Sequence, residues 1–461
     1  MNLAILNIGQ LVTLAGPARP RVGKELGELA ILEDAALLIG NGREDSTPLD
    51  PGSKRAGSGS RGGEGTGFSP YIEAARMEGA LASEVRRTCR IVAVGSYSDL
   101  KSQIPPDAHV IDAAGRCVTP GFVDAHTHLV FAGNRAAEFE QRIAGATYQQ
   151  IAVAGGGILR TVALTRAASE DDLLAAARRH RDWMLRTGTT TMEAKSGYGL
   201  DRETELKMLR VIRRLNDEGP AQVIPTLLAA HTVPPEFKDC RAEYVEFIAE
   251  GLIPEVAAAG LARHCDAFCD DHAFTVDETR TVLSAAKRHG LGLRIHAEQF
   301  RPGTGAALAA ELGAATADHL ETVTEETLLA LRDAQVQPVL LPGSVFALSR
   351  SNYPPARQMI ELGLPIVLAT DFNPGSSPVP SMPFMLSLAC LEMRLSPAEA
   401  LSAATINAAW SLGLGSSVGS LEPGKQADFL IHEFSDYREL AYFVAAPNRP
   451  RVFIAGVEIK L

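Results

Sequence analysis

The sequence predicts an α/β protein: a (β/α)8 TIM-like barrel with a small composite β-sandwich domain built from both termini. Eight β-type runs alternate with helical patterns between about residues 118 and 414, which indicates parallel strands joined by helices. Short β-rich segments precede and follow this region. A chain of 461 residues is also too long for one ordinary core. We therefore expect residues 1–118 and 416–461 to share the small domain and residues 119–415 to form the barrel.

The small domain is predicted from segments at the two ends of the chain. Residues 36–39 and 91–94 are typical of strands separated by turn residues. Residues 428–431 and 451–459 have the same character. We expect the C-terminal pieces to pair with the N-terminal ones.

The N-terminal half of this domain is interrupted. Residues 42–67 are rich in glycine, serine and charge and have almost no apolar side chains to bury. Asn41-Gly42 suits a tight hairpin turn. We expect a disordered insertion over about residues 42–88 that lengthens one hairpin loop, with residues 71–87 helical at its end.

The barrel prediction depends on eight strand-like runs with helical stretches such as residues 171–185 and 203–215 between them. The runs are residues 119–123, 189–193, 223–229, 267–270, 293–296, 315–319, 336–341 and 365–370.

Composition excludes several classes of function. A formal net charge of −11 disfavours a nucleic-acid partner, which needs a basic surface. No apolar run approaches membrane-spanning length, and the first residues lack the basic start of a signal peptide. The six scattered cysteines form neither a disulfide framework nor paired zinc knuckles. We expect a cytoplasmic protein with reduced thiols that binds neither nucleic acid nor membrane.

Ligand-type residues lie at the ends of four predicted strands. In His126-Thr127-His128, alternate residues at a strand end point the same way, so both imidazoles can reach one metal ion. Alone this pattern is weak, because two ordinary polar histidines are the commoner explanation. His296 ends the fifth run, His319 the sixth and Asp371 follows the eighth. Since barrel active sites are built from the carboxyl ends of several strands, these residues together predict a metal centre.

The residue types of this centre favour hydrolysis. Histidines and one carboxylate leave a divalent or trivalent cation positively charged and open to water, which makes hydroxide available near neutral pH. A neighbouring carboxylate can accept the proton of the water, and an imidazole can stabilise or shuttle charge.

Longer motifs around these residues resemble the amidohydrolase superfamily. Residues 120–128, PGFVDAHTH, are similar to the segment that opens its barrel, and residues 370–375, TDFNPG, to the end of its eighth strand. The resemblance covers nearly the whole chain. Narrower motifs resemble the imidazolonepropionase family within it: FAGNR at 131–135, GATY at 145–148, GGGI at 155–158, KSGYGL at 195–200 and TELKML at 204–209.

The family resemblance implies a set of metal ligands and substrate contacts. The ligands of one zinc or iron ion per subunit would be His126, His128, His296 and Asp371. Contacts with substrate or product would come from Arg135, Tyr148, Tyr198, His231, Gln299, Asn373, Gly375 and Ser376.

The resemblance also implies catalytic roles. Asp371 would take the proton of the attacking water, and His319 or Glu298 would relay it to the departing nitrogen while His231 polarises the carbonyl. The insertion after Gly42 is not typical of the family. Some relatives carry Glu at position 299, so the sequence leaves open which of Glu298 and Gln299 contacts the substrate.

Three of these residues also have ordinary structural interpretations. Arg135 could be a solvated surface residue, although a substrate with a propionate arm needs a fixed cation, and arginine offers a bidentate fork. Tyr198, in a glycine-flanked loop, could be a buried structural tyrosine, and His231 a hydrogen-bonded core histidine.

The function that the resemblance implies is hydrolysis of 4-imidazolone-5-propanoate to N-formimidoyl-L-glutamate in histidine degradation. The rival enzyme class is a deaminase of the same superfamily acting on a heterocycle such as cytosine or guanine, and Arg135 with the KSGYGL motif argues against it. A non-catalytic barrel that serves as a scaffold is the other alternative, and four intact ligand positions argue against that. The sequence leaves open zinc against iron and the oligomeric state, although a homodimer fits the family.

Overall fold

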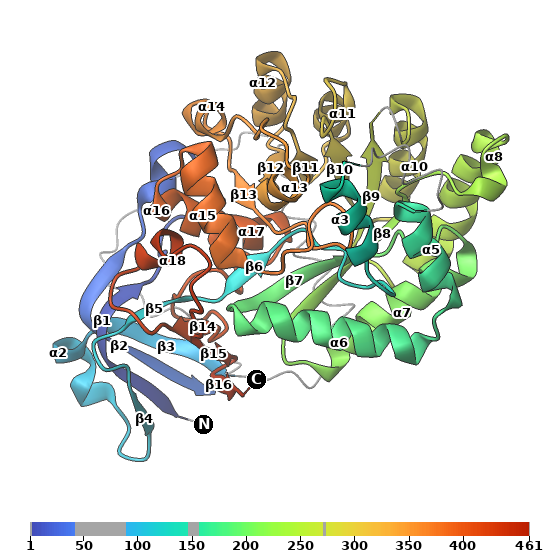
Figure 1. The fold of residues 1–461 in the computed structure, drawn as a ribbon. Coiled ribbons are helices and arrows are strands. Elements are labelled where there is room, and N and C mark those ends of the chain that lie inside the picture. Colours follow the sequence, from blue (N-terminus) through green and yellow to red (C-terminus); the bar gives the residue numbers. More distant parts are fainter. Residues whose placement is uncertain (1, 42–88, 146–155, 271–272, 461) are drawn as a thin grey trace, which may run out of the picture.

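The computed structural model describes residues 2–41, 89–145, 156–270 and 273–460. The expectations for the insertion over residues 42–88 and for Tyr148 lie outside these ranges. The described residues form a parallel barrel with a second sheet beside it, which confirms the predicted fold class (Figure 1).

The barrel is an eight-stranded parallel sheet in which every strand pairs with its neighbour in sequence. At the carboxyl ends of the first and last strands, His128 N donates to Phe372 O at 2.9 Å and Asp371 N donates to His126 O at 3.0 Å, so the sheet closes there. The strands are β6 (Phe122–Asp124), β7 (Thr189–Lys195), β8 (Gln222–Ala230), β9 (His264–Cys269), β10 (Gly292–Ala297), β11 (Thr316–His319), β12 (Gln337–Leu340) and β13 (Val367–Leu368).

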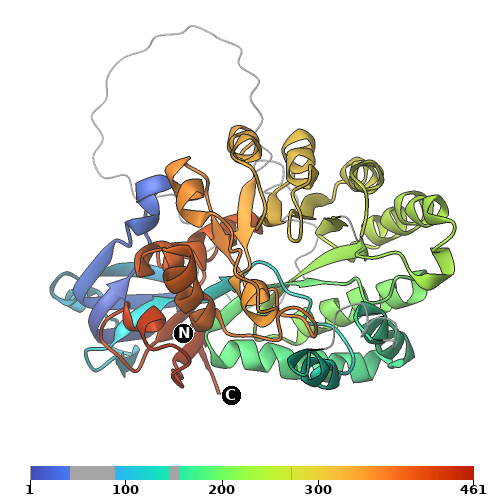
Figure 2. The same cartoon turned by 45° about the horizontal axis from the view of Figure 1, so that its top comes forward.

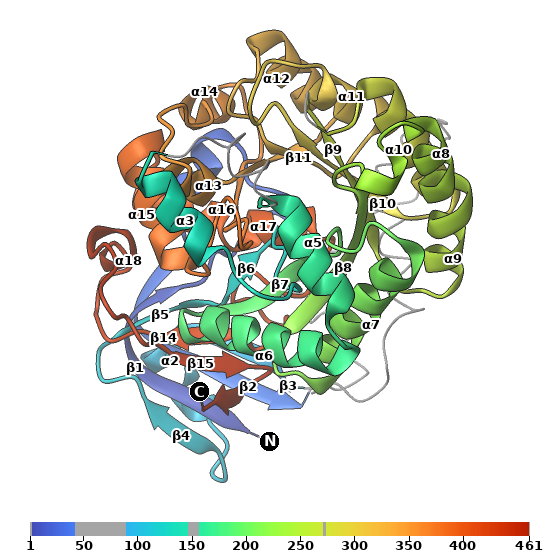
Figure 3. The ribbon, with the colours of Figure 1, turned by 45° about the vertical axis from the view of Figure 1, so that its right-hand side comes forward.

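Helices surround this ring of strands, as the view in Figure 3 shows. The longest, α6 (Glu170–Arg186) and α7 (Arg202–Glu218), extend the predicted helical stretches by a few residues at their ends. The others around the barrel are α3 (Ala136–Ile143), α5 (Ile158–Ala167), α8 (Arg241–Glu246), η4 (Phe247–Leu252), α9 (Ile253–Ala258), α10 (Val276–Arg288), α11 (Gly305–Leu312), α12 (Glu325–Asp333), α13 (Pro342–Ala347), α14 (Ala356–Glu361), α15 (Met382–Met393), α16 (Pro397–Ala403) and α17 (Ile406–Ser411).

The second sheet combines strands from both ends of the chain (Figure 2). Its order is β16-β15-β14-β5-β1-β2-β3, and β4 also pairs with β1. One apolar cluster, which includes Ile5, Leu37, Phe429 and Phe453, joins the N-terminal to the C-terminal strands. The strands are β1 (Leu3–Val12), β2 (Ile31–Asn41), β3 (Cys89–Ser96), β4 (His109–Asp112), β5 (Cys117–Pro120), β14 (Phe429–Ile431), β15 (Arg451–Ile454) and β16 (Val457–Ile459).

The short elements of the second sheet and of the connecting loops complete the fold. They are η1 (Gly23–Gly27), α2 (Tyr97–Leu100), η2 (Lys101–Gln103), η3 (Pro235–Phe237) and α18 (Glu439–Tyr442). β2 and β3 pair antiparallel, so the chain segments that flank residues 42–88 are hydrogen-bonded neighbours in the sheet. No helix among the described residues has both the length and the apolar character needed to cross a membrane.

Two segments predicted as single strands are each divided into two strands in the structure. The run over residues 119–123 is wrong as one strand, because it divides at Gly121 into β5 in the second sheet and β6 in the barrel. A Cβ at Gly121 would lie 2.2 Å from Thr190 Oγ1, so the chain changes sheets at a point where only glycine fits. Residues 451–459 form two strands around Ala455 and Gly456, whose φ angles of 46° and 73° make a tight hairpin turn.

Candidate metal centre and active-site cavity

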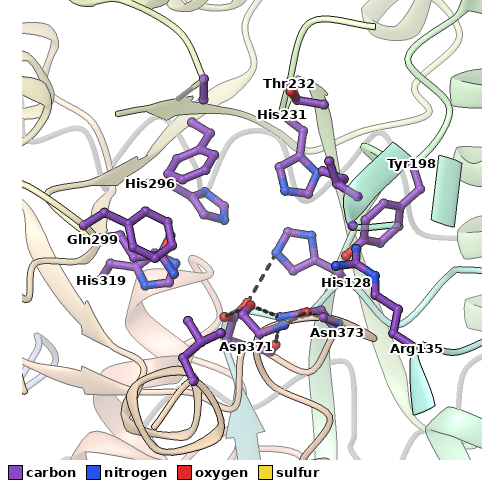
Figure 4. Close-up of a pocket in the computed structure, with 18 of the residues that line it drawn as sticks. His128, Arg135, Tyr198, His231, Thr232, His296, Gln299, His319, Asp371 and Asn373 are labelled. Atoms are coloured by element: carbon purple, nitrogen blue, oxygen red, sulfur yellow. Dashed lines mark hydrogen bonds and ion pairs between the residues drawn. The ribbon is translucent and has the colours of Figure 1, made fainter. Parts of the chain in front are cut away.

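The expected metal ligands converge at the carboxyl end of the barrel. His126 and His128 follow β6, His296 lies near the end of β10 and Asp371 follows β13. His126 Nε2 and His128 Nε2 lie 3.6 and 3.4 Å from Asp371 Oδ1, and the His126 and His296 rings are 4.5 Å apart. Figure 4 shows His128, His296 and Asp371 around one space, with His319 beside them. All these side chains are buried.

The donor atoms of this group fit a metal ion. Single ligand atoms of His126, His128 and Asp371 lie within 4.8 Å of one another, and the same is true of His126, His296 and His319. Within the described part of the chain, Nε2 of His126 and Nε2 of His296 are buried without a hydrogen-bond partner. Buried nitrogen atoms rarely remain unpaired, and imidazole nitrogen with carboxylate oxygen suits zinc or iron.

Two aspartates that the sequence interpretation missed orient these histidines. Asp318 Oδ2 accepts a hydrogen bond from His126 Nδ1 at 2.7 Å, and Asp266 Oδ1 accepts one from His296 Nδ1 at 3.1 Å. A carboxylate on Nδ1 fixes the proton there and leaves the lone pair of Nε2 for a metal. Each aspartate lies inside a barrel strand, where aspartate is uncommon and indicates a polar partner, but the sequence does not show which partner it is.

A cluster of charges fills the barrel interior beneath the histidines. Lys195 Nζ lies 2.8 Å from Glu193 and 2.7 Å from Asp266, and Arg294 Nε lies 3.1 Å from Glu193. These four side chains and Asp318 are all fully buried. Because unpaired buried charge is costly, the two cations fix where the carboxylates stand, and the carboxylates in turn fix the histidines.

The surroundings shift the acid–base properties of the candidate ligands. Burial, and then the charge of Lys195, hold the pKa of His126 well below its usual range. Burial alone would raise the pKa of Asp371, but the hydrogen bond with His128 and the charge of His319 lower it. A neutral imidazole and an ionised carboxylate are the protonation states that bind a cation.

His319 is placed to hold a proton. Its Nδ1 lies 3.2 Å from Glu321 Oε1. Although burial lowers its pKa, the charge and the hydrogen bond of Glu321 raise it above the usual value. His319 lines the cavity together with Asp371.

The structure distinguishes Glu298 from Gln299. The Glu298 carboxylate accepts hydrogen bonds from Ala306 N at 3.1 and 3.2 Å, and burial raises its pKa to about 7. It does not line the cavity, whereas Gln299 does. Gln299 Nε2 also donates to Ser344 Oγ at 3.3 Å. The geometry thus favours Gln299 for contact with a ligand.

The cavity above the candidate metal centre has a volume of about 540 Å³. Arg135, Tyr198 and His231 line one side of it (Figure 4). Arg135 Nε donates to Thr161 Oγ1 at 3.0 Å, which fixes the guanidinium. A Cβ at Gly375 would lie 2.4 Å from Arg135 Nη1, so this glycine leaves the space that the guanidinium occupies.

The loop after β13 completes the cavity wall. Asn373 Oδ1 accepts from the N–H groups of Gly375 and Ser376 at 2.8 Å each, and its Nδ2 donates to Asp371 O at 2.6 Å. Asn373 therefore uses its own carboxamide to shape the loop. Ser376 Oγ lies 3.4 Å from Asp371 Oδ2, so this loop also brings a hydroxyl to the candidate ligand.

Sequence comparison gives the family of the chain. Residues 117–459 match the amidohydrolase family. An imidazolonepropionase of Solibacter usitatus (strain Ellin6076) is 50% identical over 453 residues, which span 98% of this chain and 97% of that protein. The chain belongs to the imidazolonepropionase family. Another member, from Symbiobacterium thermophilum, is 50% identical over 434 residues, 94% of this chain and 91% of that protein. The resemblance stated from the sequence motifs is thereby confirmed.

Solved structures of two deaminases share the fold. An adenosine deaminase from Xanthomonas campestris superimposes with a TM-score of 0.65 at 18% identity and covers 99% of this chain and 92% of its own. E. coli guanine deaminase gives a TM-score of 0.64 at 16% identity, with 100% and 99% coverage. At this identity the likeness shows the barrel and its second sheet only.

Three residues in this part of the barrel have strained backbone conformations. Glu298, His319 and Asp371 have φ angles of 50°, 82° and 53°, in the left-handed region that residues other than glycine rarely adopt. Such conformations cost free energy and persist where the surroundings impose them, and they gather at functional sites. All three residues lie at or just beyond the carboxyl ends of barrel strands.

Proposed function

We propose that this member of the imidazolonepropionase family hydrolyses 4-imidazolone-5-propanoate to N-formimidoyl-L-glutamate with one zinc or iron ion. One observation carries the proposal: His128, His296, Asp371 and Arg135 line a single cavity, with His126 in the same group of possible metal ligands. The chain is also half identical to imidazolonepropionases over nearly its full length. His126, His128, His296 and Asp371 would hold the ion. When bound, the ion would polarise the carbonyl and lower the pKa of water.

Arg135 would bind the propionate of the substrate. Its Nε is engaged by Thr161, which leaves the two terminal nitrogens for two parallel hydrogen bonds to a carboxylate. Tyr198 and the loop that carries Gly375 and Ser376 enclose this end of the cavity. The imidazolone ring would then lie between Arg135 and the candidate ligands.

Asp371 and His319 would move the proton. The ionised Asp371 carboxylate can take a proton from the water that adds to the ring carbonyl. His319, whose pKa Glu321 raises, can deliver a proton to the ring nitrogen as its bond to the carbonyl carbon breaks. One water is consumed, and the carbonyl becomes the new carboxylate of the product.

His231 would accept a hydrogen bond from the imidazolone ring of the substrate. Its Nδ1 donates to Gly197 O at 3.0 Å, because a carbonyl oxygen can only accept. Burial, and then the neighbouring His128 and His296, hold its pKa well below the usual range. A neutral imidazole with its proton on Nδ1 presents a lone pair on Nε2, so His231 would bind a ring N–H. To polarise the carbonyl of the substrate, the imidazole of His231 would have to be protonated on both nitrogens.

Turnover of authentic substrate with metal analysis tests the proposed function. Purified protein with 4-imidazolone-5-propanoate should lose ring absorbance and form N-formimidoyl-L-glutamate in equal amount, in proportion to metal content. No ammonia should appear, which separates this reaction from deamination of cytosine or guanine. A fully metallated preparation that leaves the imidazolone intact would refute the proposal.

A further inference from the structure

A buried carboxylate accepts hydrogen bonds from several backbone N–H groups of the loop that follows β7. Glu205 lies in the first turns of α7 with no solvent exposure. Its Oε1 accepts from Gly199 N at 2.8 Å and from Leu200 N at 2.9 Å. Gly197 N donates to both carboxylate oxygens, at 3.2 and 3.1 Å. Converging backbone N–H groups form an anion site, and here the anion is a side chain of the same protein.

The backbone of this loop has a conformation that needs such support. Gly197 has a φ of 101° and Leu200 a φ of 57°, both in the left-handed region. A Cβ at Gly197 would lie 2.9 Å from Leu228 O and 3.0 Å from His231 Nδ1. The loop therefore approaches the end of β8 closely, and the carboxylate of Glu205 satisfies the N–H groups that this path leaves without a strand or helix partner.

The supported loop places two side chains of the cavity. Tyr198 lies between Gly197 and Gly199, whose backbone N–H groups donate to Glu205. Its ring centre lies 5.4 Å from that of His231 and 6.0 Å from that of His128. The Gly197 carbonyl accepts the Nδ1 proton of His231 at 3.0 Å. Figure 4 shows Tyr198 and His231 side by side at the cavity. The Glu205 carboxylate thus fixes the loop backbone that carries Tyr198. It also fixes the Gly197 carbonyl, which orients His231.

We infer that Glu205 is a positioning residue for substrate binding, acting through Tyr198 and His231. This inference rests on the proposed function. Glu205 does not line the cavity, so it cannot touch the substrate. Glu205 belongs to the TELKML motif on α7, and its contacts with the loop amides connect this motif to the KSGYGL loop.

Glu205→Gln is the informative change because it keeps the shape and removes the charge. One of the two oxygens becomes an NH2 group. Even if Oε1 keeps its place and its three N–H donors, the NH2 group at the Oε2 position faces the Gly197 N–H, so a donor meets a donor and the negative charge is lost. Glu203→Gln is the matched control, since Glu203 is exposed on the same helix, two residues away. Gly199→Ala tests the same contact from the loop side, because a Cβ there would lie 2.6 Å from Glu205 N.

Steady-state kinetics with 4-imidazolone-5-propanoate and metal analysis decide the inference. We expect Glu205→Gln to lower kcat/KM by about 10- to 100-fold, the range for a displacement of contact groups by about 1 Å, with metal content unchanged. Glu203→Gln should match the wild type. In a Tyr198→Phe/His231→Gln background, adding Glu205→Gln should cause little further loss, because its effect passes through those two residues.

Several results would overturn this role of Glu205. The first is a wild-type kcat/KM in Glu205→Gln, and the second is loss of metal from that variant. The third is an undiminished fall in kcat/KM when Glu205→Gln is added to the Tyr198→Phe/His231→Gln background. If Glu205→Gln does not fold, Gly199→Ala must show the same fall in kcat/KM with full metal content, and normal kinetics there would contradict the inference. Failure of the wild type and of Glu203→Gln to turn over the substrate would instead contradict the proposed function.

Discussion

Arg135→Met removes the cation that we assign to the propionate of the substrate. Since Nε donates to Thr161 Oγ1 at 3.0 Å, two terminal nitrogens remain for the carboxylate. A charge-assisted hydrogen-bonded contact is worth about 1.5–3 kcal/mol, and a factor of ten in rate corresponds to about 1.4 kcal/mol. We therefore expect kcat/KM to fall about 10- to 200-fold. Metal content should not change, because Thr161 of α5 holds the guanidinium and no candidate ligand depends on it.

The assay compares two substrates and a control variant. An imidazolone without the propionate arm should be turned over poorly by the wild type and equally poorly by Arg135→Met. Arg160→Met is the matched control, because Arg160 is exposed on α5 next to Thr161 in sequence, and it should behave as the wild type. An equal fall for both substrates would refute the carboxylate assignment and make Arg135 a structural or transition-state residue.

Three further changes test the site and its surroundings. His126→Ala or Asp371→Ala should lose metal and activity together while circular dichroism still shows a folded barrel; full occupancy with normal turnover would contradict the ligand assignment. Asp318→Asn should weaken metal binding by about 10- to 100-fold, measured by chelator competition, because it removes the negative charge that holds the proton on His126 Nδ1; unchanged affinity would contradict the orienting role. Deleting residues 44–67 should leave turnover and stability almost unchanged, because a polar loop outside the motifs contributes mainly closure entropy; inactive but folded protein would assign the insertion a role.

Local patterns in the sequence were enough to predict the barrel and the second sheet. Runs of β-type residues between amphipathic helices mark the strands, and His296, His319 and Asp371 could be assigned to one site because parallel strands bring their carboxyl ends together. The division at Gly121 was missed, because it depends on contact with Thr190 in a neighbouring strand rather than on the residues around it.

The residues that orient the site could not be predicted, because their partners are set by strand register. Asp318 lies beside His296 across the β10–β11 pair but bonds to His126, three strands away around the barrel. Thr161 meets Arg135 only because α5 packs against the loop after β6. Such pairings are decided by the closed barrel, which no local pattern encodes.

Turnover in water enriched in oxygen-18 tests the central claim most directly. Hydrolysis at the ring carbonyl predicts that each product molecule carries one labelled oxygen, located by fragment mass spectrometry in the new carboxylate of N-formimidoyl-L-glutamate. Attack at the carbon between the two ring nitrogens would instead place the label in a formyl group and leave a primary amide. Label in a formyl group, or release of ammonia during the first turnover, would contradict the account.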